Sequence, residues 1–254
     1  MLKNFNPVTE KENIIRWIRE WFEKNGKSAK AVIGISGGKD SSVTAALCVE
    51  ALGKDRVVGV LMPNGVQSDI SDSEALVKHL DIQRIAVNIG DVFNTFINTL
   101  EASIDKDKQE ISKDLRINLP PRLRMASLYA IAQSFPEGGR VINTCNRSED
   151  YIGYSTKYGD AAGDMSPLAG YTVTEVKEIG RSLKLPSFLV DKTPSDGLSG
   201  MSDEDKIGFT YDTLDRYILT GVCEDATIRK KIDRMHVLNL HKLKTIPYYD
   251  PGIY

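Results

Sequence analysis

Short apolar runs alternate with longer segments of helical periodicity in the first part of the chain. Four of these runs are rich in β-branched residues and predict buried strands, at residues 29–36, 57–63, 83–89 and 140–144. The amphipathic segments between them predict helices, at residues 41–52, 71–80, 92–104 and 123–134. Strands that alternate with helices build βαβ units. We therefore expect an α/β fold, with a doubly wound parallel sheet that helices cover on both faces.

The segments that flank this pattern are also predicted to be helical. Thr9 begins a capping box, which indicates a helix that starts there and ends near Asn25. Residues 105–118 are charge-dense and indicate either a solvated connection or a peripheral helix. Pro120 and Pro121 are then expected to begin the next ordered segment.

The last third of the chain shows helical patterns without further strands. Helices are predicted at residues 173–183, 211–219 and 226–235, and a loop rich in Gly, Ser and Asp at 193–205. Since no linker-like stretch divides the chain, we expect a single domain over residues 1–254. Its α/β core would span about 29–170, followed by a mobile loop and a C-terminal helical extension at 171–254.

Composition excludes several classes of protein. The chain is 41% hydrophobic and 27% charged, which is ordinary for a soluble globular protein. Its net charge of −2 argues against a nucleic-acid-binding surface over the whole molecule. The longest uncharged windows are shorter than the roughly 18 residues of a membrane span, and the N-terminal residues lack the apolar segment of a signal peptide. We expect a cytoplasmic protein without a membrane or nucleic-acid partner.

The three cysteines, Cys48, Cys145 and Cys223, are odd in number and widely spaced, and none belongs to a CxxC pair. This pattern predicts reduced thiols in the core and makes a zinc or redox centre improbable.

The most informative segment is residues 34–42, which read GISGGKDSS at a predicted strand-to-helix turn. Glycines let the backbone approach a ligand closely, and the amides of a helix N-terminus favour an anion. Serine hydroxyls add donors, so the segment predicts a phosphate cradle. Asp40 fits such a cradle if a Mg²⁺ ion bridges its carboxylate to the phosphates. The candidate nucleotide-binding residues are Gly34, Ile35, Ser36, Gly37, Gly38, Lys39, Asp40, Ser41 and Ser42.

Two commoner phosphate motifs do not match this segment. A Walker A loop has four residues between its glycines and a Ser or Thr after its Lys, whereas three residues separate Gly34 from Gly38 and Asp40 follows Lys39. The dinucleotide fingerprint G-x-G-x-x-G is also absent. The pattern S-G-G-x-D-S instead resembles the loop of the ATP pyrophosphatases, which have an adenine-nucleotide α-hydrolase-like fold and cleave ATP to AMP and pyrophosphate.

Motifs further along the chain indicate one family among these enzymes. In order they are LRM at 123–125, TCNRSE at 144–149, TKYGD at 156–160, PSDGL at 194–198, SDE at 202–204 and HK at 241–242. With the loop, they resemble the NAD synthetases over about residues 10–245. The resemblance implies a ligase that amidates deamido-NAD to NAD, using ATP as co-substrate and ammonia as nitrogen donor. An acyl-adenylate would form, and AMP and pyrophosphate would leave.

The resemblance also implies roles for individual residues. Asp40 and Glu149 match the Mg²⁺ ligands, and Thr144 and Ser195 match ATP contacts beyond the loop. Val173 occupies an ATP-contacting position where the family usually has Lys, so one phosphate contact would be missing. The positions that match deamido-NAD contacts are Arg124, Lys157, Asp164, His241 and Lys242.

Asp160 matches the position that holds ammonium beside the activated carboxylate, and we expect it and Asp40 to be the catalytic residues. A carboxylate both attracts ammonium and can accept its proton. The loop at 193–205 is a candidate lid that excludes water from the adenylate. The resemblance further implies a homodimer with the dinucleotide site near its interface.

Two other interpretations remain at this point. One is an enzyme with the same loop that modifies tRNA, although the chain shows neither paired reactive cysteines nor a basic appendage. The other is a noncatalytic nucleotide-binding module. With some 30 residues before the first predicted strand, we expect no amidase domain and hence free ammonia, not glutamine, as the nitrogen donor.

Overall fold

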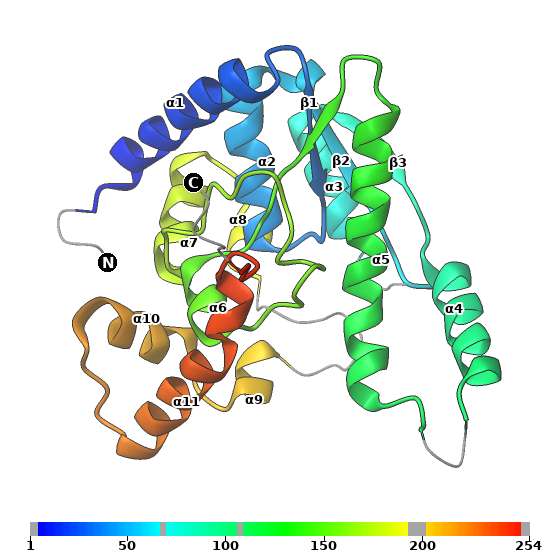
Figure 1. Cartoon of the computed structure of the whole chain (residues 1–254). Helices are drawn as coiled ribbons and strands as arrows, with labels where there is room; N and C mark the ends of the chain where they lie inside the picture. Colours follow the sequence, from blue (N-terminus) through cyan, green and yellow to red (C-terminus); the bar gives the residue numbers. More distant parts are fainter. Residues whose placement is uncertain (1–4, 67–69, 106–108, 193–201, 250–254) are drawn as a thin grey trace.

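The computed structural model describes residues 5–66, 70–105, 109–192 and 202–249, and a parallel sheet of four strands forms its centre (Figure 1). Ala31 pairs with Val57 on one side and with Arg140 on the other, so β1 is an internal strand. The predicted doubly wound parallel sheet is confirmed. In spatial order the strands are β3 (Gln83–Ala86), β2 (Val57–Leu61), β1 (Lys30–Gly34) and β4 (Gly139–Val141).

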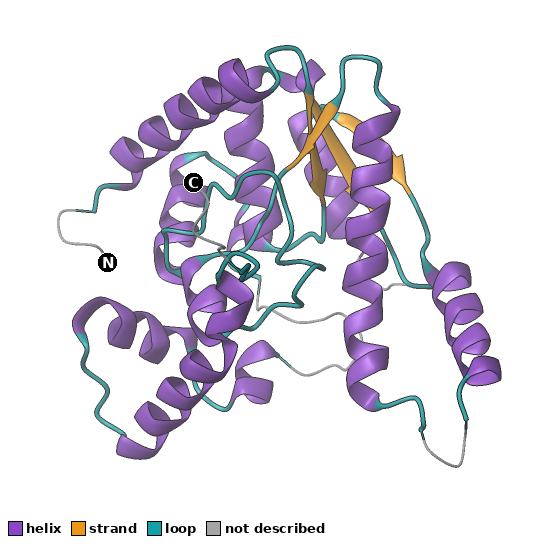
Figure 2. Cartoon of the chain, viewed as in Figure 1, coloured by secondary structure: helices purple, strands orange, loops and turns teal. Residues whose placement is uncertain are grey.

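Helices cover both faces of the sheet. Successive side chains of a strand point to opposite faces, so an apolar strand needs cover on each face. Ala31 and Ile33 are fully buried in one hydrophobic cluster, and Val32, between them, is fully buried in another. Figure 2 shows the strands flanked by helices. The first cluster lies under α1 (Pro7–Asn25), α2 (Lys39–Leu52), α3 (Ile70–Leu80), α7 (Val173–Ser182) and α8 (Ser187–Val190). The second lies under α5 (Lys113–Ser134), against which α4 (Gly90–Ser103) packs.

The order of the strands reverses between β1 and β4. From β1 the chain runs outward through α2, the short 3₁₀ turn η1 (Lys54–Arg56), β2 and α3 to β3. It returns through α4 and α5 to β4, on the far side of β1. In open α/β sheets, ligands bind at the carboxyl ends of the strands where the order reverses. The fold therefore points to the segments that follow β1 and β4.

Helices beyond the sheet close this end of the molecule. Helix α6 (Arg147–Ile152) follows β4, and α9 (Asp203–Ile207), α10 (Tyr211–Thr220) and α11 (Ala226–Leu243) gather beside it at the lower left of Figure 1. A third hydrophobic cluster joins these helices to the start of α7 and to the segment between α9 and α10, and is made of Ile152, Val173, Ile207, Phe209, Tyr211, Leu214 and Ile232. Within the described residues, no helix is both long and apolar enough to cross a bilayer.

Some predicted boundaries were wrong. Helix α1 begins at Pro7 instead of Thr9. The side chain of Asn6 accepts hydrogen bonds from the N–H groups of Val8 and Thr9, and Pro7 fits the first helical position. Helix α2 begins at Lys39, two residues earlier than expected. Consequently the residues expected in a loop before the helix form its first turn.

The expectation that Pro120 and Pro121 begin a new ordered segment was also wrong, because α5 starts at Lys113 and continues through both prolines. Two backbone N–H groups are missing there, yet Leu119 and Pro120 are buried and Pro121 lies against Gly159. A Cβ added to Gly159 would meet the Cβ of Pro121 at 3.0 Å. Packing on this side of the helix compensates for the two missing hydrogen bonds.

Near the end of the chain, α11 extends beyond the predicted residues 226–235 to Leu243, and α9 occupies part of the predicted loop at 193–205. Residues 193–201 of that loop lie outside the described residues. Cys48 and Cys145 are buried as expected, but Cys223 is only half-buried, so it is not a core thiol.

Candidate active site

The predicted phosphate cradle at residues 34–42, called the phosphate loop from here on, joins β1 to α2. Hydrogen bonds of its own serines hold its shape. Gly37 has φ +76°, and a Cβ there would meet the Cβ of Asp72 at 2.8 Å, so the position requires glycine. The Ser36 and Ser41 hydroxyls are 3.1 Å apart, and the Ser42 hydroxyl donates to the Gly38 carbonyl at 2.7 Å. The first turn of α2 follows directly, and its free N–H groups make this an anion-binding end.

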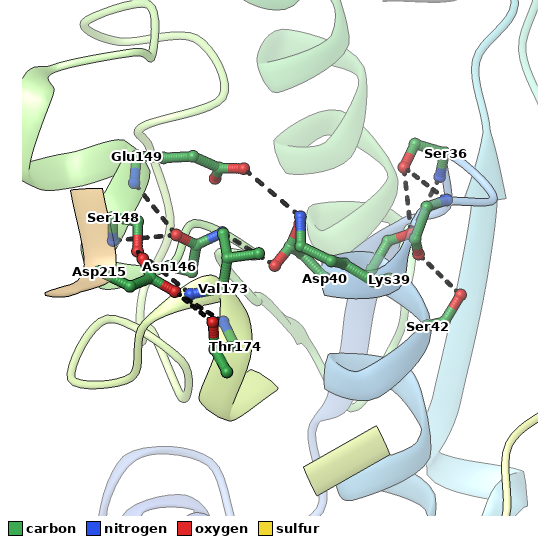
Figure 3. Close-up of polar contacts among 12 residues, drawn as sticks. Ser36, Lys39, Asp40, Ser42, Asn146, Ser148, Glu149, Val173, Thr174 and Asp215 are labelled. Carbon is green, nitrogen blue, oxygen red and sulfur yellow. Dashed lines mark hydrogen bonds and ion pairs between the residues drawn. The ribbon is translucent and has the colours of Figure 1, made fainter. Parts of the chain in front are cut away.

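Two carboxylates meet beside this loop (Figure 3). Asp40 belongs to the first turn of α2 and Glu149 to the first turn of α6, the helix that follows β4. The ammonium of Lys39 lies between them, 2.8 Å from Asp40 Oδ2 and 4.0 Å from Glu149 Oε1. The structure thus brings together the two predicted Mg²⁺ ligands. Both lie in the first turn of a helix, and each side chain is only 17% exposed.

Partial burial determines the electrostatics of this group. Desolvation raises the pKa of Glu149, and the nearby Asp40 carboxylate raises it further, while the charge of Lys39 acts in the opposite direction. Burial by itself would lower the pKa of Lys39, but the Asp40 and Glu149 carboxylates outweigh it and the pKa of Lys39 is raised. The lysine is therefore an ammonium that balances two closely spaced acids.

The side chain of Asn146 fixes the relative position of the two acids. Its carbonyl accepts the N–H groups of Ser148 and Glu149, each at 3.0 Å, which caps α6. Its amide donates to Asp40 Oδ1 at 2.9 Å, and so links α6 to α2. The sequence motif contained Asn146, but its role was missed. An Asn directly before a helix with an acidic first turn is a signal that could have indicated this cap.

These residues fit a magnesium ion. Among the residues described, no group of three or more His, Cys, Asp and Glu side chains could hold a metal. Mg²⁺, however, is usually bound through one or two carboxylates together with substrate phosphates and water. Asp40 and Glu149 beside a phosphate-binding loop provide that donor set.

The other predicted ATP contacts have different surroundings. Thr144 is half-buried just beyond β4. Val173 is 4% exposed, its side chain belongs to the third hydrophobic cluster, and its N–H donates to the Ser148 hydroxyl at 3.1 Å. Its side chain therefore contributes packing in this structure. Ser195 lies outside the described residues.

A second polar group forms where α11 meets the segment after α6. Lys157 Nζ donates to the carbonyl of His241 at 3.1 Å, and Lys242 Nζ donates to the carbonyls of Gly153 and Ser155 at 2.7 and 2.9 Å. The structure therefore gathers three of the five predicted dinucleotide contacts, and it brings Lys157 to the adjacent pair His241 and Lys242 from a distant part of the sequence.

Asp160 belongs to this second group. Its carboxylate accepts the N–H of Thr156 at 2.7 Å, and the charges of Lys242 and Arg124 are close enough to act on it. The side chain is exposed, but protein atoms around it reduce the solvation of the carboxylate and raise its pKa. Arg124 Nε donates to the carbonyl of Met62 at 3.0 Å, which holds the guanidinium near the carboxyl ends of the strands.

Asp164 does not join this group through the contacts it makes. Its carboxylate accepts the N–H of Val141, at the end of β4, at 2.7 Å and the Tyr129 hydroxyl at 3.3 Å. It therefore fixes the edge of the sheet. Its role in binding a dinucleotide remains a prediction.

Comparison with known proteins gives a consistent result. The model of the family described as NAD synthase matches residues 10–248. An NH(3)-dependent NAD(+) synthetase of Thermoplasma acidophilum is 38% identical over 242 residues, which cover 92% of this chain and 95% of the relative. The NMN synthetase of Francisella tularensis has a solved structure with a TM-score of 0.87 and 31% identity, covering 97% of this chain and all of that one. The NAD+ synthetase of Burkholderia pseudomallei gives a TM-score of 0.77 at 26% identity, with 94% and 91% covered.

Proposed function

Because the chain belongs to the NAD synthase family, ATP-driven ligases that form a C–N bond with ammonia, we propose that it activates the nicotinate carboxylate of deamido-NAD as an acyl-adenylate. The observation that carries this proposal is the meeting of Asp40 and Glu149 beside the phosphate loop, with Lys39 between them. A carboxylate pair beside an anion-binding loop suits a metal-bound polyphosphate, which is the group that must leave.

In the first step the nicotinate carboxylate attacks the α-phosphorus of ATP. A carboxylate oxygen bonds to phosphorus, and the bond from that phosphorus to the bridging oxygen breaks, which releases pyrophosphate. The loop amides and the serines at 36, 41 and 42 would hold the β- and γ-phosphates, and α2 favours their negative charge. Magnesium, when bound by Asp40 and Glu149, would neutralise charge that develops on the leaving pyrophosphate.

In the second step ammonia attacks the carbonyl carbon of the adenylate. The C–N bond forms, the bond to the AMP oxygen breaks, and the nitrogen loses a proton. Asp160 suits the role of proton acceptor because its carboxylate lies at the second polar group and its pKa is raised toward that of a more effective base. Lys157, His241 and Lys242 would bind the dinucleotide beside it.

The resemblance further supports a cytoplasmic homodimer. Light scattering of the purified chain tests its assembly.

Identifying the nucleotide products tests the proposed function. The protein is incubated with ATP, Mg²⁺, deamido-NAD and an ammonium salt, and the products are separated by anion-exchange chromatography. We expect AMP and pyrophosphate in equal amounts, with NAD. ADP as the main product would rule out cleavage between the α- and β-phosphates.

A second candidate acceptor is the mononucleotide of nicotinate. The NMN synthetase of Francisella tularensis superposes over its whole length, and its TM-score of 0.87 exceeds the 0.77 of the Burkholderia NAD+ synthetase. Both acceptors present the same nicotinate carboxylate, so the same adenylation would serve either. The ratio of kcat/KM for the dinucleotide and the mononucleotide, measured side by side, distinguishes the two.

A further inference from the structure

Lys39 is almost completely buried, and its ammonium contacts both acids that fit magnesium. The residue is 3% exposed, with Nζ 2.8 Å from Asp40 Oδ2 and 4.0 Å from Glu149 Oε1 (Figure 3). We propose that this ammonium and the metal occupy the carboxylate pair alternately, so that Lys39 has to leave before Mg²⁺ can bind. The inference rests on the proposed function, because it takes Asp40 and Glu149 as the metal ligands.

The geometry makes the two cations mutually exclusive. A metal that bridges the carboxylates needs the same Asp40 oxygen that the ammonium now contacts, and its bonds to oxygen are about 2.1 Å long. The other Asp40 oxygen accepts the amide of Asn146 at 2.9 Å. A bridging metal would therefore lie within a few ångströms of Nζ, where like charges repel strongly at this degree of burial.

The surroundings of Lys39 suit a side chain with two positions. The ammonium lies 5.7 Å from the centre of the Tyr211 ring, which stabilises a cation in the present position. The Tyr211 hydroxyl is buried and has no hydrogen-bond partner among the described residues. Such a buried group is costly unless another state satisfies it. Within the described part of the chain, the Tyr211 hydroxyl therefore lacks a hydrogen bond in the conformation that the structure records.

The phosphate loop offers the displaced ammonium a second position. Lys39 is the first residue of α2 and directly follows Gly38, while the neighbouring Ser36 is exposed. A polyphosphate bound at this loop is an anion within reach of the lysine stem. When metal and nucleotide bind together, the Lys39 ammonium would leave the carboxylates and pair with phosphate. Metal alone would displace the ammonium from the carboxylates without giving it a new anionic partner. Metal should therefore bind weakly in the absence of ATP.

Metal binding without nucleotide tests this inference. Mn²⁺, a spectroscopic substitute for Mg²⁺, is titrated into the wild type, Lys39→Gln and Lys24→Gln, and free Mn²⁺ is measured by electron paramagnetic resonance. Lys24 is an exposed residue of α1, so its variant removes the same charge far from the site. We expect at least tenfold tighter binding in Lys39→Gln and no change in Lys24→Gln. In the double variant Lys39→Gln/Asp40→Asn, the gain should disappear.

Equal or weaker binding in Lys39→Gln, or no binding in any of the proteins, would overturn the inference. The nucleotide products of the wild type are determined separately, so the proposed function can stand when the inference fails. A crystal structure of the wild type with Mn²⁺ and a non-hydrolysable ATP analogue gives a second test, independent of whether the variant folds. Lys39 Nζ should have left both carboxylates, and a persisting contact with Asp40 beside bound metal would refute the exchange.

Discussion

Asp40 and Glu149 are separated by more than a hundred residues, and they meet because β1 and β4 are neighbours in the sheet. Replacing either by its amide, Asp40→Asn or Glu149→Gln, should lower kcat at least about a hundredfold, because each removes charge that positions the leaving pyrophosphate. Steady-state rates at saturating Mg²⁺ measure the effect. Glu20→Gln, an exposed change on α1, is the matched control and should retain full activity. Near-normal rates in either site variant would refute its metal role.

Val173 permits a test of whether a phosphate contact is missing. The family Lys at this position suggests that Val173→Lys should strengthen ATP binding, but the Val173 side chain is buried with Ile152 and Leu214. Burying an unpaired ammonium should cost about 2 kcal/mol or more, which lowers the Tm by roughly 4–8 °C. Since Lys39 already supplies a cation beside the loop, the KM for ATP should not fall. Calorimetry and kinetics measure both, and a lower KM with unchanged Tm would contradict this prediction.

The sequence identified most of the residues of the candidate site, but it could not reveal their contacts. The motif GISGGKDSS placed Asp40 and Lys39 in a phosphate loop, and the structure confirms the strand-to-helix turn. The position of Lys39 between two acids depends on β4 lying beside β1, a long-range pairing that no local pattern specifies. Asp164 shows the same limit, since its contact with Val141 depends on a segment 23 residues away.

Asp215 of α10 links its own helix to α6 and α7. Its buried carboxylate accepts the Ser148 hydroxyl from α6, and from α7 it accepts the Thr174 N–H at 2.8 Å and hydroxyl at 2.7 Å (Figure 3). Ser148 directly precedes Glu149, so this network also positions the side of α6 that carries the proposed metal ligand.

We expect Asp215→Asn to lower both stability and activity. The Asn amide nitrogen would face a hydrogen-bond donor at a position where a carboxylate oxygen now accepts the bond. A buried polar group would then lose its partner, which should cost about 2 kcal/mol. The kcat should fall about tenfold as α6 shifts. Asp212→Asn, an exposed change on the same helix, should alter neither. Thermal unfolding and initial rates test this, and an unchanged Tm in Asp215→Asn would show that the network does not hold the helices.

Local signals in the sequence predicted the existence of each element more accurately than its first and last residues. The four strands and most helices were expected, because periodicity reports which face is buried. The continuous α5 was not, since Pro120 and Pro121 ordinarily end a helix and their tolerance depends on packing against the distant Gly159. The start of α1 was misplaced because both Asn6 and Thr9 are good caps, and only the fold shows which of them is used.

The cysteines of the described residues are poorly suited to a glutaminase. Burial raises the pKa of Cys48 to about 12, and burial also raises the pKa of Cys145 well above its usual range. An amidase needs an activated thiolate beside a base. Cys223 is half-buried and its thiol contacts the carbonyl of Asp225. These environments agree with the ammonia dependence of the relatives.

We therefore predict that free ammonia supports NAD synthesis and that glutamine does not. At a fixed total concentration of ammonium salt, the rate should rise with pH, because deprotonation increases the fraction of free amine. The assay compares an ammonium salt with glutamine freed of ammonia, over a range of pH at which folding is verified by circular dichroism. Glutamine-driven synthesis by the purified chain would overturn the prediction and leave the adenylation chemistry untouched.

The sheet order β3-β2-β1-β4 accounts for the meeting of two groups of residues that the sequence places far apart. Alternation of strands and helices predicted a parallel sheet, but the side on which the fourth strand adds was not encoded in that pattern. The third hydrophobic cluster likewise joins α6 and α7 to the C-terminal helices through side chains that look alike in sequence. Long-range packing thus determines the site, whereas local patterns determine its parts.

Activation of the nicotinate carboxylate through an acyl-adenylate would transfer a carboxylate oxygen to AMP, and an isotope label follows that transfer. Deamido-NAD labelled with ¹⁸O in both carboxylate oxygens is converted with unlabelled ATP, Mg²⁺ and an ammonium salt, and the products are examined by mass spectrometry. We expect one ¹⁸O in the phosphate of AMP and one in the amide of NAD, because the attacking oxygen stays on phosphorus when ammonia displaces AMP. AMP without label, or label in pyrophosphate or ADP, would contradict it.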